Sequence, residues 1–434
     1  MRRLTAAVLT SLALWSAVSL RGAAVYAQRL DPVLLEQFLA DPLADQPRDP
    51  ALPQPAVERP LSPLELYTLE QTLDALNQQA QALLAAGEVG PAFELWRREV
   101  RLRRVLGSAA ELIAIERVAP LAWNNQRSVD VRLLTQRLRE IWAETAAQPE
   151  PDEARLERLL TLFTVLRDEE GVIGVTQQLA DRAAARGDGT TQRQRLAALG
   201  DAYLAWFEFD KAAAVFERLV ADVAGQNRPA QEQVLLQQLI YSYQQNSRYA
   251  EAIPYQQRLL GLYRGSNLAE SEVPLEIAIA RNYRALENYP QAVEYYQLAY
   301  RTAQQLEQYG YSSEVLQDLG ELYRSLDQFD DAITMYNLLV RIEQQSYNHY
   351  GILYAYDQLG QIYQTLGDRE NALVAFRSGL AFAESLDYRQ DYFQTQIEKT
   401  ESGEIEDAET ESGDSTGASE AEDQAGETNP AVDP

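Results

Sequence analysis

One column of residues stays apolar when the chain is read in steps of forty. It begins with aliphatic and large aromatic residues and ends in five tyrosines: Leu83, Trp123, Phe163, Tyr203, Tyr243, Tyr283, Tyr323 and Tyr363. A second column, nine residues later, holds alanine: Ala212, Ala252, Ala292, Ala332 and Ala372. Self-similarity at a fixed period is typical of a solenoid, in which each unit packs only on its neighbours. We therefore expect an extended array with a long surface.

The repeating region is predicted to be helical. Ser62 can cap a helix, Pro63 suits its first turn, and Glu65 completes a capping box, so the folded part should begin here. From there to about residue 383 helix follows helix, and proline and glycine cluster at turns more than inside the periodic segments. No stretch alternates apolar and polar residues with a period of two, so strands are not expected.

Four segments share a Leu-Gly-x-x-Tyr or Ile-Ala-x-x-Tyr pattern, followed by an alanine and an aromatic residue. They are Leu199, Gly200, Tyr203, Ala212 and Phe216; Ile279, Ala280, Tyr283, Ala292 and Tyr296; Leu319, Gly320, Tyr323, Ala332 and Tyr336; and Leu359, Gly360, Tyr363, Ala372 and Phe376. The pattern resembles the tetratricopeptide repeat (TPR) family. Small residues would let paired helices approach closely, and the aromatic residues would fill the space between adjacent hairpins.

The resemblance implies an all-α fold, a right-handed α-solenoid of about eight TPR or TPR-like helical hairpins. The period of 40 exceeds the 34 residues usual for the family. Longer helices or longer turns between repeats would absorb the difference. We expect five repeats in residues 191–395. Residues 62–190 fit less well and are expected to be degenerate TPR-like hairpins, with a change of character near residue 190.

The two ends of the chain have different compositions. Residues 1–27 have a basic start, an apolar stretch and a small-residue site after Ala27, which predicts a cleaved signal peptide. An uncleaved membrane anchor is the alternative. Residues 28–61 are rich in proline and are expected to form a semi-rigid linker, with a helical turn or two in the apolar run Val33–Leu39. Residues 396–434 are acidic and poor in apolar residues, so a disordered tail is expected.

Composition excludes several classes of function. The net charge of −27 disfavours wholesale nucleic-acid binding, which needs a basic face. Without cysteine and with a single histidine, His349, the chain offers no thiolate or clustered imidazole ligands. No phosphate-binding loop or dinucleotide fingerprint occurs. We therefore expect no catalytic residues, no metal, no cofactor and no enzymatic activity.

The first helices of each repeat would line a concave groove, as the resemblance implies. Residues expected to point into it carry amide, guanidinium, carboxylate or phenol groups: Tyr241, Gln244, Gln245, Arg281, Arg284, Glu321, Arg324, Gln361 and Gln364. Such groups can hydrogen-bond an extended peptide. The alternative is that these side chains are ordinary soluble helix surface. The tyrosines Tyr203, Tyr243, Tyr283, Tyr323 and Tyr363 are expected to serve repeat packing.

Ten arginines lie between Arg97 and Arg139, and the spacing of Arg97, Arg101 and Arg104 places these three on one helical face. In an acidic protein they would form a local basic face for an acidic partner, an anionic membrane surface or the protein's own tail. The alternative is ion pairing within helices, such as Glu94 with Arg98 and Glu99 with Arg103.

These features predict an exported scaffold or assembly factor that binds a protein or peptide partner through its groove. Its location would be the periplasm or a thylakoid lumen, because the glutamine-rich, cysteine-free style is similar to TPR proteins of cyanobacteria, some of which assist the assembly of photosynthetic complexes. A membrane-anchored envelope-organising protein with an uncleaved N-terminus is the alternative. The sequence does not indicate an oligomeric state.

Overall fold

The computed structural model describes residues 30–44, 47–54, 59–148, 150–226, 228–265 and 269–403. Every regular element in these ranges is a helix, and no strand occurs among them. The segment predicted as a signal peptide, residues 1–27, lies outside the described residues, as do residues 404–434 of the predicted tail. None of the described helices is both long and apolar enough to cross a membrane.

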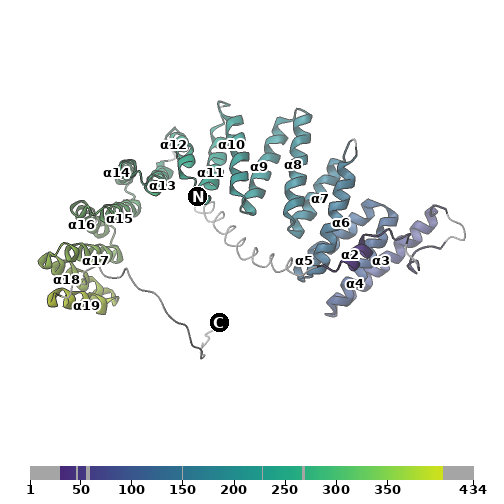
Figure 1. The fold of residues 1–434 in the computed structure, drawn as a ribbon, viewed down its shortest axis with the longest axis horizontal. Helices are drawn as coiled ribbons and strands as arrows, with labels where there is room; N and C mark the ends of the chain where they lie inside the picture. Colours follow the sequence, from purple (N-terminus) through teal and green to yellow (C-terminus); the bar gives the residue numbers. More distant parts are fainter. Residues whose placement is uncertain are drawn as a thin grey trace, which may run out of the picture. The chain divides into compact units, whose positions relative to one another are not determined.

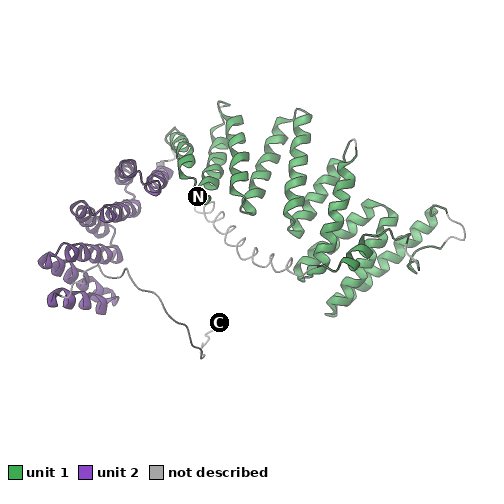
Figure 2. Cartoon of the chain, viewed as in Figure 1, with its two compact units in different colours: residues 1–266 green, residues 267–434 purple. Residues whose placement is uncertain are grey.

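The chain divides into two compact units, residues 1–266 and 267–434 (Figure 2). Unit 1 holds the short helix α2 and five helical hairpins. Their helices are α2 (Pro32–Leu39), α3 (Pro63–Ala85), α4 (Val89–Arg103), α5 (Ser108–Asn124), α6 (Ser128–Ala146), α7 (Glu153–Leu166), α8 (Glu169–Ala185), α9 (Gly189–Ala205), α10 (Phe209–Val223), α11 (Pro229–Gln245) and α12 (Tyr249–Gly265). The predicted change of character near residue 190 falls inside unit 1, where α9 begins.

Unit 2 holds three hairpins and a closing helix. They are α13 (Glu272–Ala285), α14 (Tyr289–Gln305), α15 (Tyr309–Ser325), α16 (Phe329–Gln345), α17 (His349–Thr365), α18 (Arg369–Leu386) and α19 (Gln390–Ser402). Within this unit α13 and α15 lie on one side and α14 and α16 on the other (Figure 1). With the five hairpins of unit 1, the described residues contain the eight hairpins that the sequence predicts.

The forty-residue period arises from the helix length. Nine of the described helices, α5, α8, α9, α11, α12 and α14 to α17, each have 17 residues, and short turns join the helices of a hairpin. The extra residues of each repeat therefore lengthen the helices. Inside the hairpins the turns contain a residue with positive φ, as at Ser247, Glu287 and Asp327. In the five repeats from Tyr203 onward, the backbone carbonyl of the tyrosine in the forty-residue column accepts a hydrogen bond from the end of the turn. For example, the backbone N–H of Gln328 donates to the carbonyl oxygen of Tyr323 at 2.9 Å.

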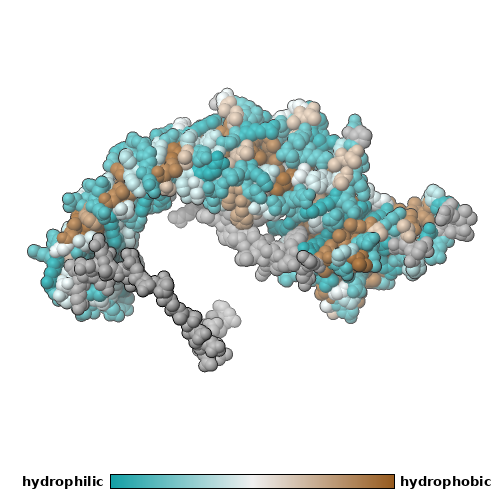
Figure 3. Space-filling model, viewed as in Figure 1, coloured by the Kyte–Doolittle hydropathy of each residue, from teal (hydrophilic) through white to brown (hydrophobic). Residues whose placement is uncertain are grey.

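The predicted start of the folded region is confirmed at α3. Ser62 and Glu65 form a reciprocal capping box, and Pro63 is the first helical residue. The core runs along each unit as a series of buried clusters, which join the hairpins through alanine, leucine and aromatic side chains. On the visible face hydrophilic residues predominate over small hydrophobic patches (Figure 3).

The segment predicted as a proline-rich linker packs on unit 1 where it is described. Residues 32–39 form α2, and Leu52 is buried against leucines of α3 and α4. Asp49 accepts two hydrogen bonds from Arg98 of α4, at 2.6 and 2.8 Å. The helical turns expected at Val33–Leu39 are present as α2. The expectation of a semi-rigid spacer was wrong for residues 47–54, because Leu52 lies among the prolines and has apolar surface to bury.

The boundary predicted for the disordered tail was also placed too early. Helix α19 continues to Ser402, so residues 396–402 are helical. Phe393 and Thr400 of α19 are buried, and Phe393 lies against Gly379 of α18. The acidic composition of the following residues concealed these two anchoring positions.

Candidate functional site

The first helices of the unit 2 repeats are joined by polar contacts at a regular spacing. Arg281 of α13 binds Asp318 of α15 at 2.8 Å, and its guanidinium also contacts Glu314 at 2.8 Å. One turn further along, Arg284 of α13 faces Glu321 of α15 at 3.7 Å. Both Arg281–Asp318 and Arg284–Glu321 join residues 37 positions apart, which is one repeat less one helical turn. We call this series the polar ladder.

The polar ladder continues into α17 and α19. Arg324 of α15 donates to Gln358 at 2.6 Å and to Gln361 of α17 at 3.1 Å. Gln361 in turn contacts the hydroxyl of Tyr392 in α19 at 3.3 Å. Gln364 donates to Thr400 of α19 at 2.7 Å. The ladder therefore contains all six groove residues predicted within unit 2.

The outer atoms of the polar ladder remain accessible to solvent. The side chains of Arg281 and Glu321 are each 49% exposed, and that of Arg284 is 34% exposed. Exposed ion pairs contribute only about 0–1 kcal/mol to stability, because water competes for both charges. A partner that offers carboxylate or amide oxygens can therefore replace these contacts at little cost to the fold.

The three groove residues predicted in unit 1 are arranged differently. Tyr241 of α11 makes an edge-to-face contact with Phe209, with ring centroids 6.3 Å apart. Gln244 is half-buried and Gln245 is exposed. Their side chains make no hydrogen bond to any residue that the structure describes. They are separate polar groups on α11 and do not join it to the first helix of another described repeat.

The column tyrosines lie at the ends of the first helices, with their rings against the next helix. Tyr243 donates a hydrogen bond to Glu217 of the preceding repeat, and its ring stacks on Tyr255. The pKa of Tyr243 is raised, mainly because the hydroxyl is buried and secondly because it donates to the Glu217 carboxylate. Tyr283, Tyr323 and Tyr363 are partly buried against the core clusters of unit 2. In unit 1, the Nζ atom of Lys211 lies 5.8 Å from the centre of the Tyr203 ring.

The predicted basic face is largely an internal ion-pair network. Arg97 pairs with the buried Asp130 at 3.1 Å, and Arg104 pairs with the buried Glu111 at 2.8 Å. The Arg104 side chain is only 10% exposed, and Arg101 is half-buried. The hypothesis of an open basic surface was wrong at Arg104, because its charge is neutralised inside unit 1.

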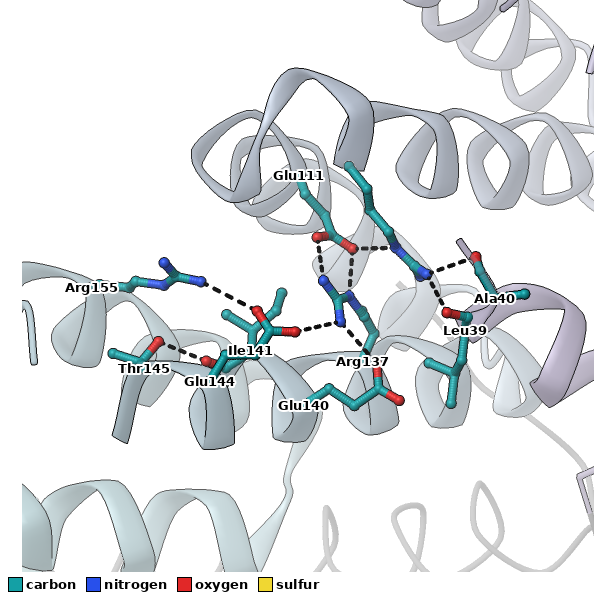
Figure 4. A network of polar contacts seen from close by, with 10 residues as sticks. Leu39, Ala40, Glu111, Arg137, Glu140, Ile141, Glu144, Thr145 and Arg155 are labelled. Carbon is teal, nitrogen blue, oxygen red and sulfur yellow. Dashed lines mark hydrogen bonds and ion pairs between the residues drawn. The ribbon is translucent and has the colours of Figure 1, made fainter. Parts of the chain in front are cut away.

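Glu111 of α5 is the centre of this network (Figure 4). Its carboxylate accepts from Arg104 and, through two bonds of 2.7 and 2.9 Å, from Arg137 of α6. Arg137 also reaches Glu140 at 2.8 Å. Of the two ion pairs weighed from the sequence, Glu99 with Arg103 is present at 2.7 Å, whereas Arg98 pairs with Asp49. Local spacing could not reveal Glu111, Asp130 or Asp49 as partners, because they come from other elements.

Sequence reasoning missed several partners in the polar ladder, although it included Glu321. Asp318, Glu314 and Tyr392 were not among the predicted residues, although a search for opposite charges at a separation of 37 would have found Asp318. His349 is the first residue of α17, and its ring lies edge-on to Phe382 at 5.7 Å. Within the described ranges, no group of three or more acidic or histidine side chains could hold a metal ion.

The family comparison identifies the repeats. The tetratricopeptide repeat model matches residues 271–345 and, one repeat further along, residues 311–385. These matches cover hairpins α13–α14, α15–α16 and α17–α18. No curated protein matches the chain by sequence. The matched family is typically non-catalytic and binds protein or peptide partners, and no enzymatic family is indicated.

Solved structures of similar architecture have low sequence identity to the chain. BtubC (BKLC) from P. vanneervenii is 18% identical, with 59% of this chain and 99% of that chain covered and a TM-score of 0.35. The apo form of RapI is 15% identical, with 69% and 83% covered and a TM-score of 0.42. Aspartyl phosphate phosphatase F from Bacillus subtilis is 15% identical, with 80% and 81% covered and a TM-score of 0.37.

Values this low carry no argument about function. The assignment rests on the family model and on the succession of helical hairpins. Residues 271–385 carry the sequence signature of the tetratricopeptide repeat family, and the described residues before them fold into the same kind of helical hairpin.

Proposed function

We propose that the protein is a non-catalytic scaffold or assembly factor that binds an extended peptide segment of a protein partner along the first helices of unit 2. The partner would supply carboxylate or carbonyl oxygens to the arginines of the polar ladder and amide hydrogens to its carboxylates.

The observation that carries this proposal is the half-exposed polar ladder. Its guanidinium groups are held in place by Asp318, Gln358 and Gln361, so their positions are fixed before a partner arrives. Such preorganisation lowers the entropic cost of binding. Because the rungs recur with the repeat, a partner with an extended backbone would meet similar groups at regular intervals.

Charge reversal at two rungs tests the proposal. In the double variant Arg284→Glu and Arg324→Glu, two arginines 40 residues apart on the first helices change sign. The matched control is Arg301→Glu with Arg341→Glu, which are exposed arginines 40 residues apart on the second helices α14 and α16. Both variants have the same net charge and the same spacing. Affinity capture from cell extract with quantitative mass spectrometry measures the partners retained by each.

We expect the ladder variant to lose about tenfold or more of its specific capture, which corresponds to ~1.4 kcal/mol of binding free energy. The control should retain the wild-type level. Equal capture by the two variants, with both folded by circular dichroism, would contradict binding at the ladder.

We also propose that the protein is exported, to a periplasm or a thylakoid lumen. The support is the sequence of residues 1–27, with its basic start, apolar stretch and small-residue site. Fractionation and N-terminal sequencing of the native protein test this. A chain that begins at Gln28 in an extracytoplasmic fraction supports cleavage and export, whereas an intact N-terminus in the membrane fraction supports the anchored, envelope-organising alternative.

A further inference from the structure

The short helix α2 lies on unit 1 as a docked segment outside the repeat pattern. It packs against α4 and α6, the second helices of the first two hairpins. Its apolar residues face unit 1: Phe38 is buried in the main core cluster, and Leu30, Leu34, Leu35 and Leu39 pack against it. Hydrophobic residues gather around the position of α2 in Figure 3. Val33, on the opposite side of the helix, is 59% exposed.

Arg104 binds the C-terminal end of α2. Its Nη1 donates to the carbonyl oxygens of Leu39 at 2.9 Å and Ala40 at 3.4 Å, and its guanidinium lies 5.2 Å from the centre of the Phe38 ring. A guanidinium at this place satisfies carbonyls that a helix end leaves open and complements the helix dipole. Glu111 holds the other side of Arg104. The contact therefore recognises the backbone of a helix C-terminus together with an aromatic side chain in its last turn.

The surface continues beyond the N-terminal end of α2. A groove of about 400 Å³ is lined by Leu30, Leu35, Thr135, Arg139 and Asp168, among others. A second groove of about 450 Å³ shares Arg139 and Asp168 and extends over Trp142 and Ile173. Thr135 is only 5% exposed. Its hydroxyl has no hydrogen-bond partner among the described residues.

We propose that this surface of α4, α6 and α8 is a docking site for an amphipathic helix of a partner protein, and that α2 occupies part of it as an internal competitor. The partner helix is longer than α2 and carries apolar residues spaced as Leu30, Leu34, Leu35, Phe38 and Leu39 are. Its C-terminal carbonyls meet Arg104. Its N-terminal part crosses the two open grooves.

Charge complementarity favours a partner helix in this direction. The second groove is bordered by Asp168, Glu169 and Glu170, with Arg139 as the only basic residue in its lining. Asp168 caps α8 and pairs with Arg139 at 2.6 Å, and Glu170 pairs with the same arginine at 2.8 Å. Three carboxylates against one guanidinium still leave the lining of this groove with an excess of negative charge. A basic residue near the start of the partner helix would strengthen the contact.

Helix α2 is suited to be displaced. It has eight residues, and isolated helices this short are marginal in water. It binds because the chain holds it close, which raises its effective concentration. A longer helix that also fills the open grooves buries more apolar surface and can replace it. This inference concerns a surface separate from the polar ladder and stands without the function proposed above.

Peptide binding to the full-length chain tests the site. The probe is a fluorescein-labelled peptide with the sequence of residues 30–44, measured by anisotropy. In the variant Leu34→Asp with Phe38→Asp, the buried face of α2 is charged, so α2 should leave the surface. The matched control Val33→Asp places the same charge on the exposed face of the same helix. A peptide carrying Phe38→Asp controls for nonspecific binding.

We expect the undocked variant to bind the probe at least about tenfold more tightly than the wild type and the Val33→Asp control do. Adding Arg104→Met to the undocked variant should weaken that binding. Equal probe binding by the undocked and control chains would overturn the proposal, provided both retain wild-type helicity. A stable dimer of the wild-type chain that dissociates on adding the probe would also overturn it, because a second copy would then be the occupant.

Discussion

Glycine and aromatic residues fit together within the hairpins. A Cβ atom placed on Gly200, Gly320 or Gly360 would lie 2.6, 2.7 or 2.4 Å from the ring of Phe216, Tyr336 or Phe376, respectively. Each ring comes from the second helix of the same hairpin, so these aromatic residues fill the space inside a hairpin as well as between neighbours. The glycine and the aromatic residue recur together in the sequence because the ring occupies the space that a side chain at the glycine position would need.

The substitution Gly360→Ala should destabilise unit 2 by about 1–3 kcal/mol, because the added methyl group must displace the buried ring of Phe376. Urea unfolding followed by circular dichroism measures the change. Gly310→Ala is the matched control in α15, since nothing lies within 4 Å of its Cβ position. An equal or smaller loss for Gly360→Ala than for the control would show that α17 and α18 are not closely packed here.

At the scale of elements, segments outside the repeats complete both units. Residues 47–54 are held on α3 and α4 by Leu52 and by the Asp49–Arg98 pair, and α19 covers the end of the last hairpin with Phe393. Terminal repeats need such covers, because their outer faces would otherwise expose core residues. Helix α2 differs from these two segments, since grooves that no described residue fills remain beside it.

Acid should loosen residues 47–54. The hydrogen bond from Arg98 lowers the pKa of Asp49. A carboxyl whose pKa is lower when folded contributes stability above its unfolded pKa of about 3.9 and loses that stability as the pH falls through its folded pKa. Hydrogen exchange, expressed as protection factors at pH 6 and pH 3, should therefore show protection of this segment falling in acid.

The variant Asp49→Asn provides the control for this pH dependence. It should have low protection of residues 47–54 at both pH values, with little further change in acid. If wild type and variant lost protection in parallel between the two pH values, Asp49 would not be the group that titrates.

At the scale of the whole molecule, stability is expected to be local. Within each unit, each hairpin packs on its neighbours in sequence, and contacts between more distant repeats of that unit are few. Such arrays behave as one-dimensional chains of units with nearest-neighbour coupling. A defect in one repeat should therefore affect adjacent helices first, in contrast to a globular core that unfolds as a whole.

Removal of the buried Glu111 tests this locality. The variant Glu111→Ala leaves Arg104 and Arg137 without their shared carboxylate, and loss of one partner from a buried ion pair costs about 3–5 kcal/mol. Hydrogen exchange should show deprotection of α4 to α7, whereas α15 to α19 keep wild-type protection. Uniform deprotection of all helices would contradict nearest-neighbour behaviour. Glu116→Ala, at a more exposed ion pair of the same helix, is the control.

The sequence by itself determined the helical class, the period and the number of hairpins. The reason is physical: column tyrosines, small residues and turn residues act within one repeat or between adjacent repeats, so their spacing records their contacts. The capping box at Ser62 was predictable for the same reason. So was the placement of the unit 2 groove residues on one series of helices.

Only the tertiary structure decided what the arginines do. Arg98, Arg104 and Arg137 have partners in other elements, 49, 7 and 26 residues away in sequence, and composition gives no sign of these pairings. It also decided that residues near Phe38 and Leu52 pack on unit 1, where proline content had predicted a spacer. Burial depends on which surfaces meet in space, and no local pattern encodes that when the two segments lie outside the repeat.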